Sequence, residues 1–347
     1  MNKFKGKNPF GGQSKMLYHI KNLYEYLYKG DTYPFFIEIN LTSKCQLACQ
    51  WCISSNFRCN DTLDTDELIK FLGDFYKYGG RAVTFSGGGE PTLHSDFKEI
   101  SITAKKIGLR LGLMTNGVYP SIYNPVIGMV YDWVRFSLDT INHKKYKKWK
   151  GTDKVNQVLD NIKELKNYPV KVGINCNIFE EHTLEDIKEL ISIMPDVADY
   201  IQFRPVLPRY YEFEKSYINE DIVEWLDNCS IGRPWLIMSE DKFYDVVYGD
   251  LFTFESCEGH FFNPVLDANG NLCVCMYHPK DDRFVFGNIY EKSYKKIWKS
   301  KQRQQVIEFV RNLDYKNECQ ACCKLAEVNK LMDFINHPEK GEDIHFL

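Results

Sequence analysis

The chain has 347 residues, of which 44 are Lys or Arg and 47 are Asp or Glu, so its formal net charge is -3. This near balance gives no reason to expect a nucleic-acid partner, and 44% hydrophobic with 15% aromatic residues excludes global disorder. Twelve cysteines indicate metal or redox chemistry in a cytoplasmic protein rather than disulfides. Because no run approaches about 18 uncharged apolar residues and no secretory signal is present, we expect no membrane partner.

Residues 1–33 form an entry segment with a predicted amphipathic helix over residues 15–28. We expect its apolar positions to pack inward because they recur at helical spacing: Leu17, Ile20, Leu23, Tyr24 and Leu27. Strands are then predicted over residues 35–41, 81–85, 109–114, 132–137, 170–177 and 199–204. Helices are predicted between them over residues 64–78, 95–107, 120–129, 153–167 and 183–193. The lysine-rich run between Lys144 and Lys154 is interpreted as a solvated helix face.

This alternation predicts an α/β fold, because strands alternating with helices build a parallel sheet with right-handed crossovers. Six such units are too few for a closed eight-stranded barrel, so a partial (β/α)6 TIM-type barrel is expected over residues 34–206. The alternation breaks after Arg204, and residues 207–256 are interpreted as an aromatic-rich connector. Residues 257–347 are expected to form a small C-terminal domain with a β-hairpin and a C-terminal helix.

Three cysteines follow the first predicted strand in a C-x3-C-x2-C spacing: Cys45, Cys49 and Cys52. Three thiolates in one loop make a metal site. A tetrahedral structural zinc needs four ligands, whereas three thiolates on a [4Fe-4S] cluster leave one iron open to another ligand. A zinc knuckle remains the alternative from the spacing alone.

A glycine loop, Ser86-Gly-Gly-Gly-Glu90-Pro91, follows the second strand and allows the backbone to approach a ligand closely. Residues two apart in a strand share a face, and several predicted strands carry polar residues two apart. Barrel interiors are normally apolar, so this polar face predicts a ligand inside the barrel. These polar pairs are Glu38 with Asn40, Thr84 with Ser86, Asn175 with Asn177, and Gln202 with Arg204.

Together, the cysteine spacing and the glycine loop resemble the radical S-adenosylmethionine (SAM) superfamily. The resemblance implies that the open iron binds the amino and carboxylate groups of SAM. It also implies that the glycine loop holds the SAM ammonium group, and that Ser and Asn residues contact the SAM carboxylate and ribose. The residues that the resemblance assigns to SAM are Gly87, Gly88, Gly89, Glu90, Asn116, Ser137 and Asn175.

A second cysteine set follows the connector, around a hairpin turn at residues 267–270 that brings its two arms together. Its spacing resembles the twitch domain, the shortened relative of SPASM domains, which holds one auxiliary [4Fe-4S] cluster. The implied ligands are Cys257, Cys275, Cys319 and Cys322. Cys273 or Cys323 could replace a neighbour, and four-thiolate zinc remains the alternative.

The resemblance implies two [4Fe-4S] clusters, SAM, and an electron donor of the flavodoxin or ferredoxin type. The auxiliary cluster would accept an electron from the substrate, as in the similar aminocyclitol dehydrogenase of butirosin biosynthesis. We therefore expect an oxidoreductase that dehydrogenates a sugar or aminocyclitol-type small molecule, with Arg204 as a candidate catalytic contact. The molybdenum-cofactor cyclase is a weaker match, because its auxiliary cluster keeps an open iron and its chain ends in Gly-Gly, whereas this chain ends in Phe346-Leu347.

Two alternatives remain. The first is a peptide-modifying maturase. Such enzymes often carry an N-terminal winged-helix domain, which the 33 residues before the first predicted strand cannot hold. A maturase that epimerises residues would also need a thiol hydrogen donor. The unassigned candidates for that donor are Cys59, Cys176 and Cys229. The remote alternative is a non-enzymatic metal-binding protein, which would leave the glycine loop without a purpose.

Overall fold

The computed structural model describes residues 13–194, 196–206, 219–239, 242–243, 254–278, 280–319 and 323–337. Within these residues, ten strands form one sheet in the order β10-β9-β8-β1-β2-β3-β4-β5-β6-β7, and β1 to β7 run parallel. The strands are β1 (Phe36–Asn40), β2 (Ala82–Ser86), β3 (Arg110–Thr115), β4 (Trp133–Ser137), β5 (Lys171–Ile178), β6 (Tyr200–Pro205), β7 (Leu236–Met238), β8 (Val265–Leu266), β9 (Asn271–Cys273) and β10 (Val285–Asn288).

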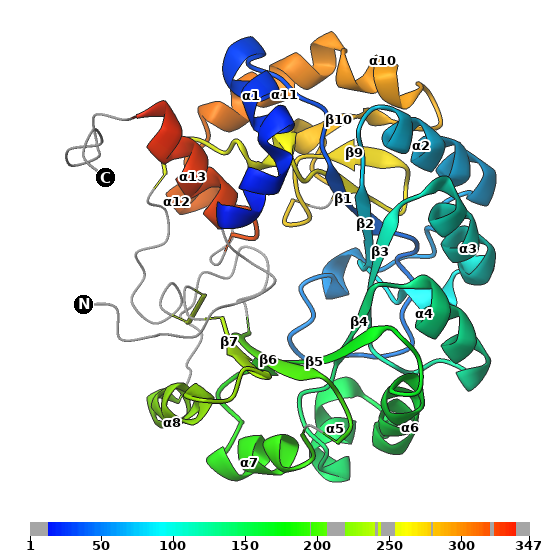
Figure 1. Cartoon of the computed structure of the whole chain (residues 1–347), viewed down its shortest axis with the longest axis vertical. Helices are drawn as coiled ribbons and strands as arrows, with labels where there is room; N and C mark the ends of the chain where they lie inside the picture. The colour runs from blue at the N-terminus through cyan, green and yellow to red at the C-terminus, as the bar shows by residue number, and fades with distance from the viewer. Residues whose placement is uncertain are drawn as a thin grey trace.

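Helices cover the outside of the curved sheet and leave its concave face as a lumen (Figure 1). The barrel helices are α2 (Thr65–Lys77), α3 (Phe97–Ile107), α4 (Asn124–Val130), α5 (His143–Lys150), α6 (Val155–Leu165), α7 (Leu184–Ser192) and α8 (Glu220–Ser230). Polar side chains start several of them: Asp64 accepts a hydrogen bond from the Glu67 amide, and Thr183 forms a capping box with Asp186. No helix in the described residues is long and apolar enough to cross a bilayer.

The structure confirms the α/β partial barrel, and each of the six predicted strands lies within one residue of its expected bounds. A seventh parallel strand, β7, was not expected. It has only three residues, too few to show a strand periodicity in the sequence. Of the predicted connector over residues 207–256, the structure describes residues 219–239, 242–243 and 254–256, which include α8 and β7.

Aromatic side chains close one end of the lumen by filling the space above two glycines. A Cβ atom at Gly173 on β5 would overlap the Tyr200 ring, and one at Gly112 on β3 would overlap the Trp133 ring. Arg135 stacks on both rings and its Nε donates to the Tyr200 hydroxyl at 3.2 Å. The polar residues nearer the carboxyl ends of the strands therefore lie above a packed floor.

The C-terminal domain continues the barrel sheet instead of standing apart from it. Strand β8 pairs in parallel with β1, and β9 and β10 follow in antiparallel order. Around this extension lie α1 (Ile20–Lys29), α10 (Tyr294–Trp298), α11 (Lys301–Arg311), α12 (Tyr315–Glu318) and α13 (Ala326–Asn336). The barrel and the second cysteine set are thus parts of one hydrogen-bonded sheet.

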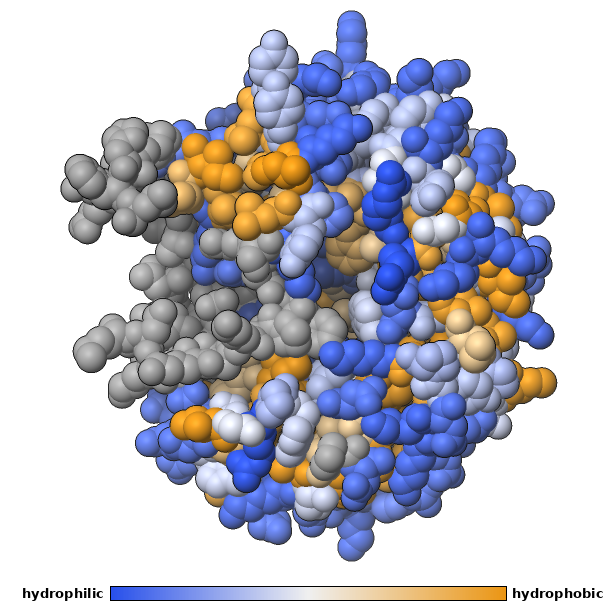
Figure 2. Space-filling view, viewed as in Figure 1, coloured by the Kyte–Doolittle hydropathy of each residue, from blue (hydrophilic) through white to orange (hydrophobic). Residues whose placement is uncertain are grey.

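The entry helix packs on a different face from the predicted one. Of the predicted apolar positions, only Leu23 is buried, with Met16 and Tyr26, against Phe261 and Met332. The buried face is the one on which Tyr26 packs against Phe261 and Phe262 and donates to Glu258 at 2.7 Å, contacts with residues more than 230 positions away. The other predicted positions stay exposed and contribute to an apolar surface beside α13 (Figure 2).

Replacing Gly173 with Ala should destabilise the protein by about 3 kcal/mol, because the new methyl group must displace the Tyr200 ring from the packed floor. Urea unfolding followed by circular dichroism measures the change. The matched control is Gly73→Ala in α2, where a Cβ meets nothing within 4 Å and should add about 0.5–1 kcal/mol of stability. Equal stability of the two variants would contradict the packed floor.

Candidate functional site

The first cysteine loop is fastened to the carboxyl end of α5. The Ala48 amide donates to the Lys150 carbonyl at 2.9 Å, and the Gln50 amide donates to the Trp149 carbonyl at 3.0 Å. Gly151 ends α5 with a φ of +85°, in van der Waals contact range of Ala48. These contacts fix the backbone between Cys45 and Cys52.

The three thiols of this loop face one another in a half-buried position. Burial raises the pKa of Cys45 and of Cys49, and neighbouring thiols raise both further. Each thiol also meets a donor or a cation. Asn116 Nδ2 donates to Cys45 Sγ at 3.7 Å, Arg58 Nη2 donates to Cys52 Sγ at 3.2 Å, and the Lys150 ammonium opposes the raised pKa of Cys49. Such surroundings suit thiolates that bind metal.

The glycine loop after β2 lies in direct backbone contact with the cysteine loop. A Cβ atom at Gly89 would overlap the Lys44 carbonyl oxygen and lie 2.7 Å from the Thr42 carbonyl oxygen. The Glu90 amide also donates to the Lys44 carbonyl at 2.8 Å. Only glycine permits this approach, so the predicted cofactor loop and the thiol loop form one unit.

The Glu90 carboxylate is buried and accepts four hydrogen bonds from the protein itself. They come from the Thr92 amide and hydroxyl at 3.2 and 2.8 Å, the Thr115 hydroxyl at 2.7 Å and the Asn116 amide at 2.7 Å. Burial raises the pKa of Glu90, and these donors oppose the rise. Glu90 therefore ties the glycine loop to the end of β3, which leaves the backbone of Gly87 to Gly89 as the part of the loop suited to a SAM contact.

A row of polar side chains crosses the lumen on neighbouring strands. Ser137, Asn175 and Gln202 are register partners on β4, β5 and β6. Gln202 Nε2 donates to the Ser239 hydroxyl at 2.8 Å, while Asn175 Oδ1 and Gln202 Oε1 are buried without a hydrogen-bond partner in the described structure. Half-buried Arg204 lies two residues beyond Gln202, on the same face. Two unsatisfied acceptors suit a ligand that brings hydroxyl or ammonium donors.

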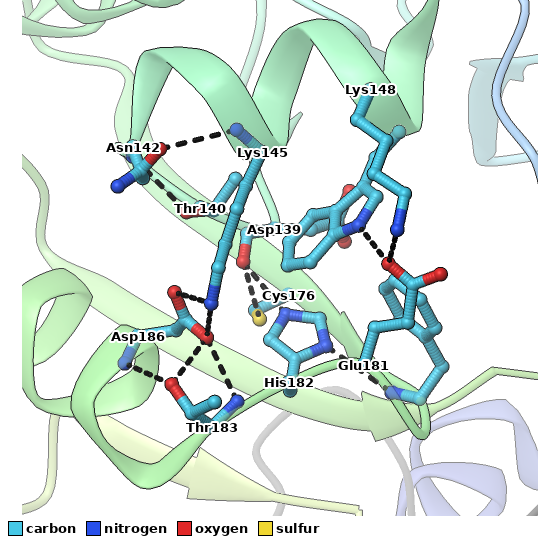
Figure 3. Close-up of polar contacts among 12 residues, drawn as sticks. Asp139, Thr140, Asn142, Lys145, Lys148, Cys176, Glu181, His182, Thr183 and Asp186 are labelled. Carbon is cyan, nitrogen blue, oxygen red and sulfur yellow. Dashed lines mark hydrogen bonds and ion pairs between the residues drawn. The ribbon is translucent and has the colours of Figure 1, made fainter.

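Helix α5 is itself anchored by ion pairs, which Figure 3 shows around Asp139 and His182. Lys145 pairs with Asp186 and Lys148 pairs with Glu181, each at 2.7 Å. Lys150 points inward and pairs with Asp139, with 3% of its side chain exposed. The interpretation of this lysine run as a solvated face was wrong for Lys150, because an internal carboxylate pairs with it.

The second set of thiols lines one narrow cavity of about 30 Å³ in the C-terminal domain. The lining cysteines are Cys257, Cys275, Cys319 and Cys323. Burial raises the pKa of Cys257, Cys319 and Cys275, to about 12 for Cys275. Predicted ligand Cys322 lies outside the described residues. Cys273 does not line the cavity.

One ion pair connects the two sites. Lys324, which follows Cys323, lines the second cavity, and its ammonium pairs with Glu38 on the lumen face of β1. Glu38 also accepts from the Ser86 hydroxyl. Sequence reasoning placed Glu38 in the lumen but missed Lys324 and Arg58, since neither belongs to a motif or to a periodic segment.

Comparisons with known proteins agree with this geometry. The radical SAM superfamily model matches residues 39–194, and the model of the SPASM iron-sulfur cluster-binding domain matches residues 257–323. The chain belongs to the radical SAM superfamily. Its cofactors are therefore SAM and two [4Fe-4S] clusters, which the three thiols of the first set and the four that line the second cavity fit in number.

This radical SAM chain resembles two curated relatives. It is 29% identical to the mitochondrial GTP 3',8-cyclase of Arabidopsis thaliana over 268 residues, 71% of this chain and 68% of the relative. It is 25% identical to molybdenum cofactor biosynthesis protein 1 of Dictyostelium discoideum over 79% of this chain, but spans only 46% of that relative. Among solved structures, Streptococcus suis SuiB bound to precursor peptide SuiA superposes with a TM-score of 0.70 at 15% identity, covering 94% of this chain and 81% of SuiB. The likeness to SuiB supports the fold alone.

Replacing Asp139 with Asn should cost about 3–5 kcal/mol of stability, because Lys150 would keep its charge in a buried position without a partner. The double variant Asp139→Asn with Lys150→Met should recover part of that loss, since it buries no unpaired charge. Denaturant unfolding measures both. As the control, Lys166→Met breaks a half-exposed pair with Asp199 and should cost at most about 1 kcal/mol. If the stability loss of the double variant equalled the sum of the losses of its two single variants, Asp139 and Lys150 would not be a coupled pair.

Proposed function

We propose that this radical SAM protein dehydrogenates a small polar substrate, of the sugar or aminocyclitol class, at one alcohol carbon. The observation that carries the proposal is the single cavity lined by four thiols. Four thiolates can ligate every iron of a [4Fe-4S] cluster. A cluster ligated in this way exchanges electrons but offers no open iron to a substrate.

Cys45, Cys49 and Cys52 would hold the first cluster, which with SAM would supply the means to abstract a hydrogen atom from an unactivated carbon. The substrate would lose one hydrogen atom, one proton and one electron in all, so that its C–OH group becomes C=O. Cys257, Cys275, Cys319 and Cys323 would hold the group that takes up the electron, and the proton would go to solvent or to a polar side chain of the lumen. The chain's own task is to hold the alcohol carbon near SAM and to exclude water.

The lumen side chains suit a substrate with several hydroxyl or amino groups. Asn175 Oδ1 and Gln202 Oε1 offer buried acceptors, and Glu38 adds a carboxylate on the same lumen face, on the distant strand β1. Arg204 remains the candidate substrate contact on β6. The Glu38 and Lys324 pair joins the lumen wall to the auxiliary cavity.

Two other radical SAM functions fit less well. Cyclisation of GTP, the activity named for one relative, would call for an open auxiliary iron, whereas four thiols line this cavity. Epimerisation would call for a thiol beside the substrate. Cys176 has the opposite strand parity from Asn175 and is buried, and Cys229 lies on α8 in the outer helix layer. These positions argue against Cys176 and Cys229 as hydrogen donors. Cys59 is the remaining candidate of the three, and its Sγ lies 3.2 Å from the Ser43 hydroxyl.

The test is anaerobic turnover with SAM, dithionite and a panel of aminocyclitols and sugars, read as 5'-deoxyadenosine and as substrate mass. Wild type should release 5'-deoxyadenosine and convert one panel member to a product lighter by two hydrogens. Replacing Cys45, Cys49 and Cys52 together with Ala should remove both products. Replacing Cys257 and Cys275 with Ala should retain SAM cleavage but lose substrate oxidation, because the electron then has no acceptor.

The matched control is Cys229→Ala, which removes a thiol outside both sites and should behave as wild type. Oxidation that survives loss of Cys257 and Cys275 would rule out the auxiliary electron acceptor. Conversion of GTP instead of a panel member would replace the proposal with cyclase activity.

A further inference from the structure

Arg58 is the charged residue in closest contact with the first thiol set. It follows a 3-10 turn at Ser55–Phe57, six residues after Cys52. Its Nη2 donates to Cys52 Sγ at 3.2 Å, and its Nη1 donates to the Leu47 carbonyl oxygen. Leu47 lies between the first two cysteines, so one guanidinium spans the beginning and the end of the thiol loop.

The charge of Arg58 is not neutralised by a carboxylate. No Asp or Glu among the described residues forms an ion pair with it, whereas Lys150, the other cation near these thiols, pairs with Asp139. A guanidinium stays protonated at any pH at which the protein is folded. The thiol set therefore experiences one full, fixed positive charge from Arg58 and a largely compensated one from Lys150.

A positive charge and a hydrogen bond at a thiolate both favour the reduced state of a cluster. Three thiolates already make the ligand set anionic, and reduction adds one more negative charge. Net charge and hydrogen bonds to the sulfurs are among the factors that set cluster potentials. Removing Arg58 would destabilise the reduced state more than the oxidised state.

We propose that Arg58 is a positioning residue that raises the reduction potential of the SAM-binding cluster through its hydrogen bond to Cys52 and its uncompensated charge. This inference rests on the first thiol set holding a [4Fe-4S] cluster, but not on the substrate. A merely structural role, in which Arg58 clamps the loop through the Leu47 carbonyl, is the competing explanation. That role would alter cluster retention and leave the potential unchanged.

The test is a redox titration of the reconstituted protein followed by electron paramagnetic resonance. The first cluster is identified as the signal that changes when SAM is added, and the auxiliary signal serves as an internal reference. Arg58→Gln should make reduction of the first cluster about tenfold less favourable at a fixed potential, a shift of about 59 mV to more negative values. Arg58→Lys retains the charge and should shift it by less than half as much.

The matched control is Arg110→Gln, which removes a 72% exposed arginine paired with Asp132 at the start of β3 and should leave both potentials unchanged. An unshifted first potential in Arg58→Gln would overturn the inference. So would loss of first-site iron in Arg58→Gln while the auxiliary cluster stays loaded, because that result assigns Arg58 to retention. The absence of any reducible signal in wild type would instead defeat the proposed function.

Discussion

The rest of the site depends on one close approach of two backbones. The glycine loop after β2 lies directly against the cysteine loop after β1, with Gly89 at the Lys44 and Thr42 carbonyl oxygens. Any side chain at Gly89 would separate the loops. The buried Glu90 carboxylate then connects the same loop to the end of β3. A cofactor bound by thiols on one loop and by backbone groups on the next thus meets a preformed surface, so little ordering has to accompany binding.

A second constraint joins the C-terminal domain to the edge of the barrel that leads into the first thiol loop. Strand β8 extends the barrel sheet at the β1 edge, and β1 leads directly into the first cysteine loop. The Lys324 and Glu38 ion pair adds a side-chain connection from the second cavity to the lumen wall. A substrate in this lumen would have the SAM site on one side and the auxiliary site on another. This arrangement suits a reaction that begins with hydrogen abstraction and ends with electron removal.

The sequence predicts the barrel well because its strands are buried, regular and separated by capped helices. Asp64, predicted to start a helix, caps α2 in the structure. The first thiol loop and the glycine loop lie in contact because they follow the paired strands β1 and β2, an arrangement that depends little on distant packing. Contacts that depend on distant packing were missed. Lys150 is buried because of Asp139, and Lys324 reaches Glu38 across more than 280 positions. The predicted face of the entry helix was wrong because Glu258 and Phe261, far along the chain, bury Tyr26.

The central claim is that both thiol sets hold [4Fe-4S] clusters. The most direct measurement is the iron, sulfide and zinc content of anaerobically reconstituted protein, in wild type and in a variant with Cys45, Cys49 and Cys52 replaced by Ala. Two clusters predict about eight irons and eight sulfides per chain, falling to about four of each in the variant. About one or two zinc ions per chain, with little iron or sulfide, would contradict the account and leave a structural metal protein.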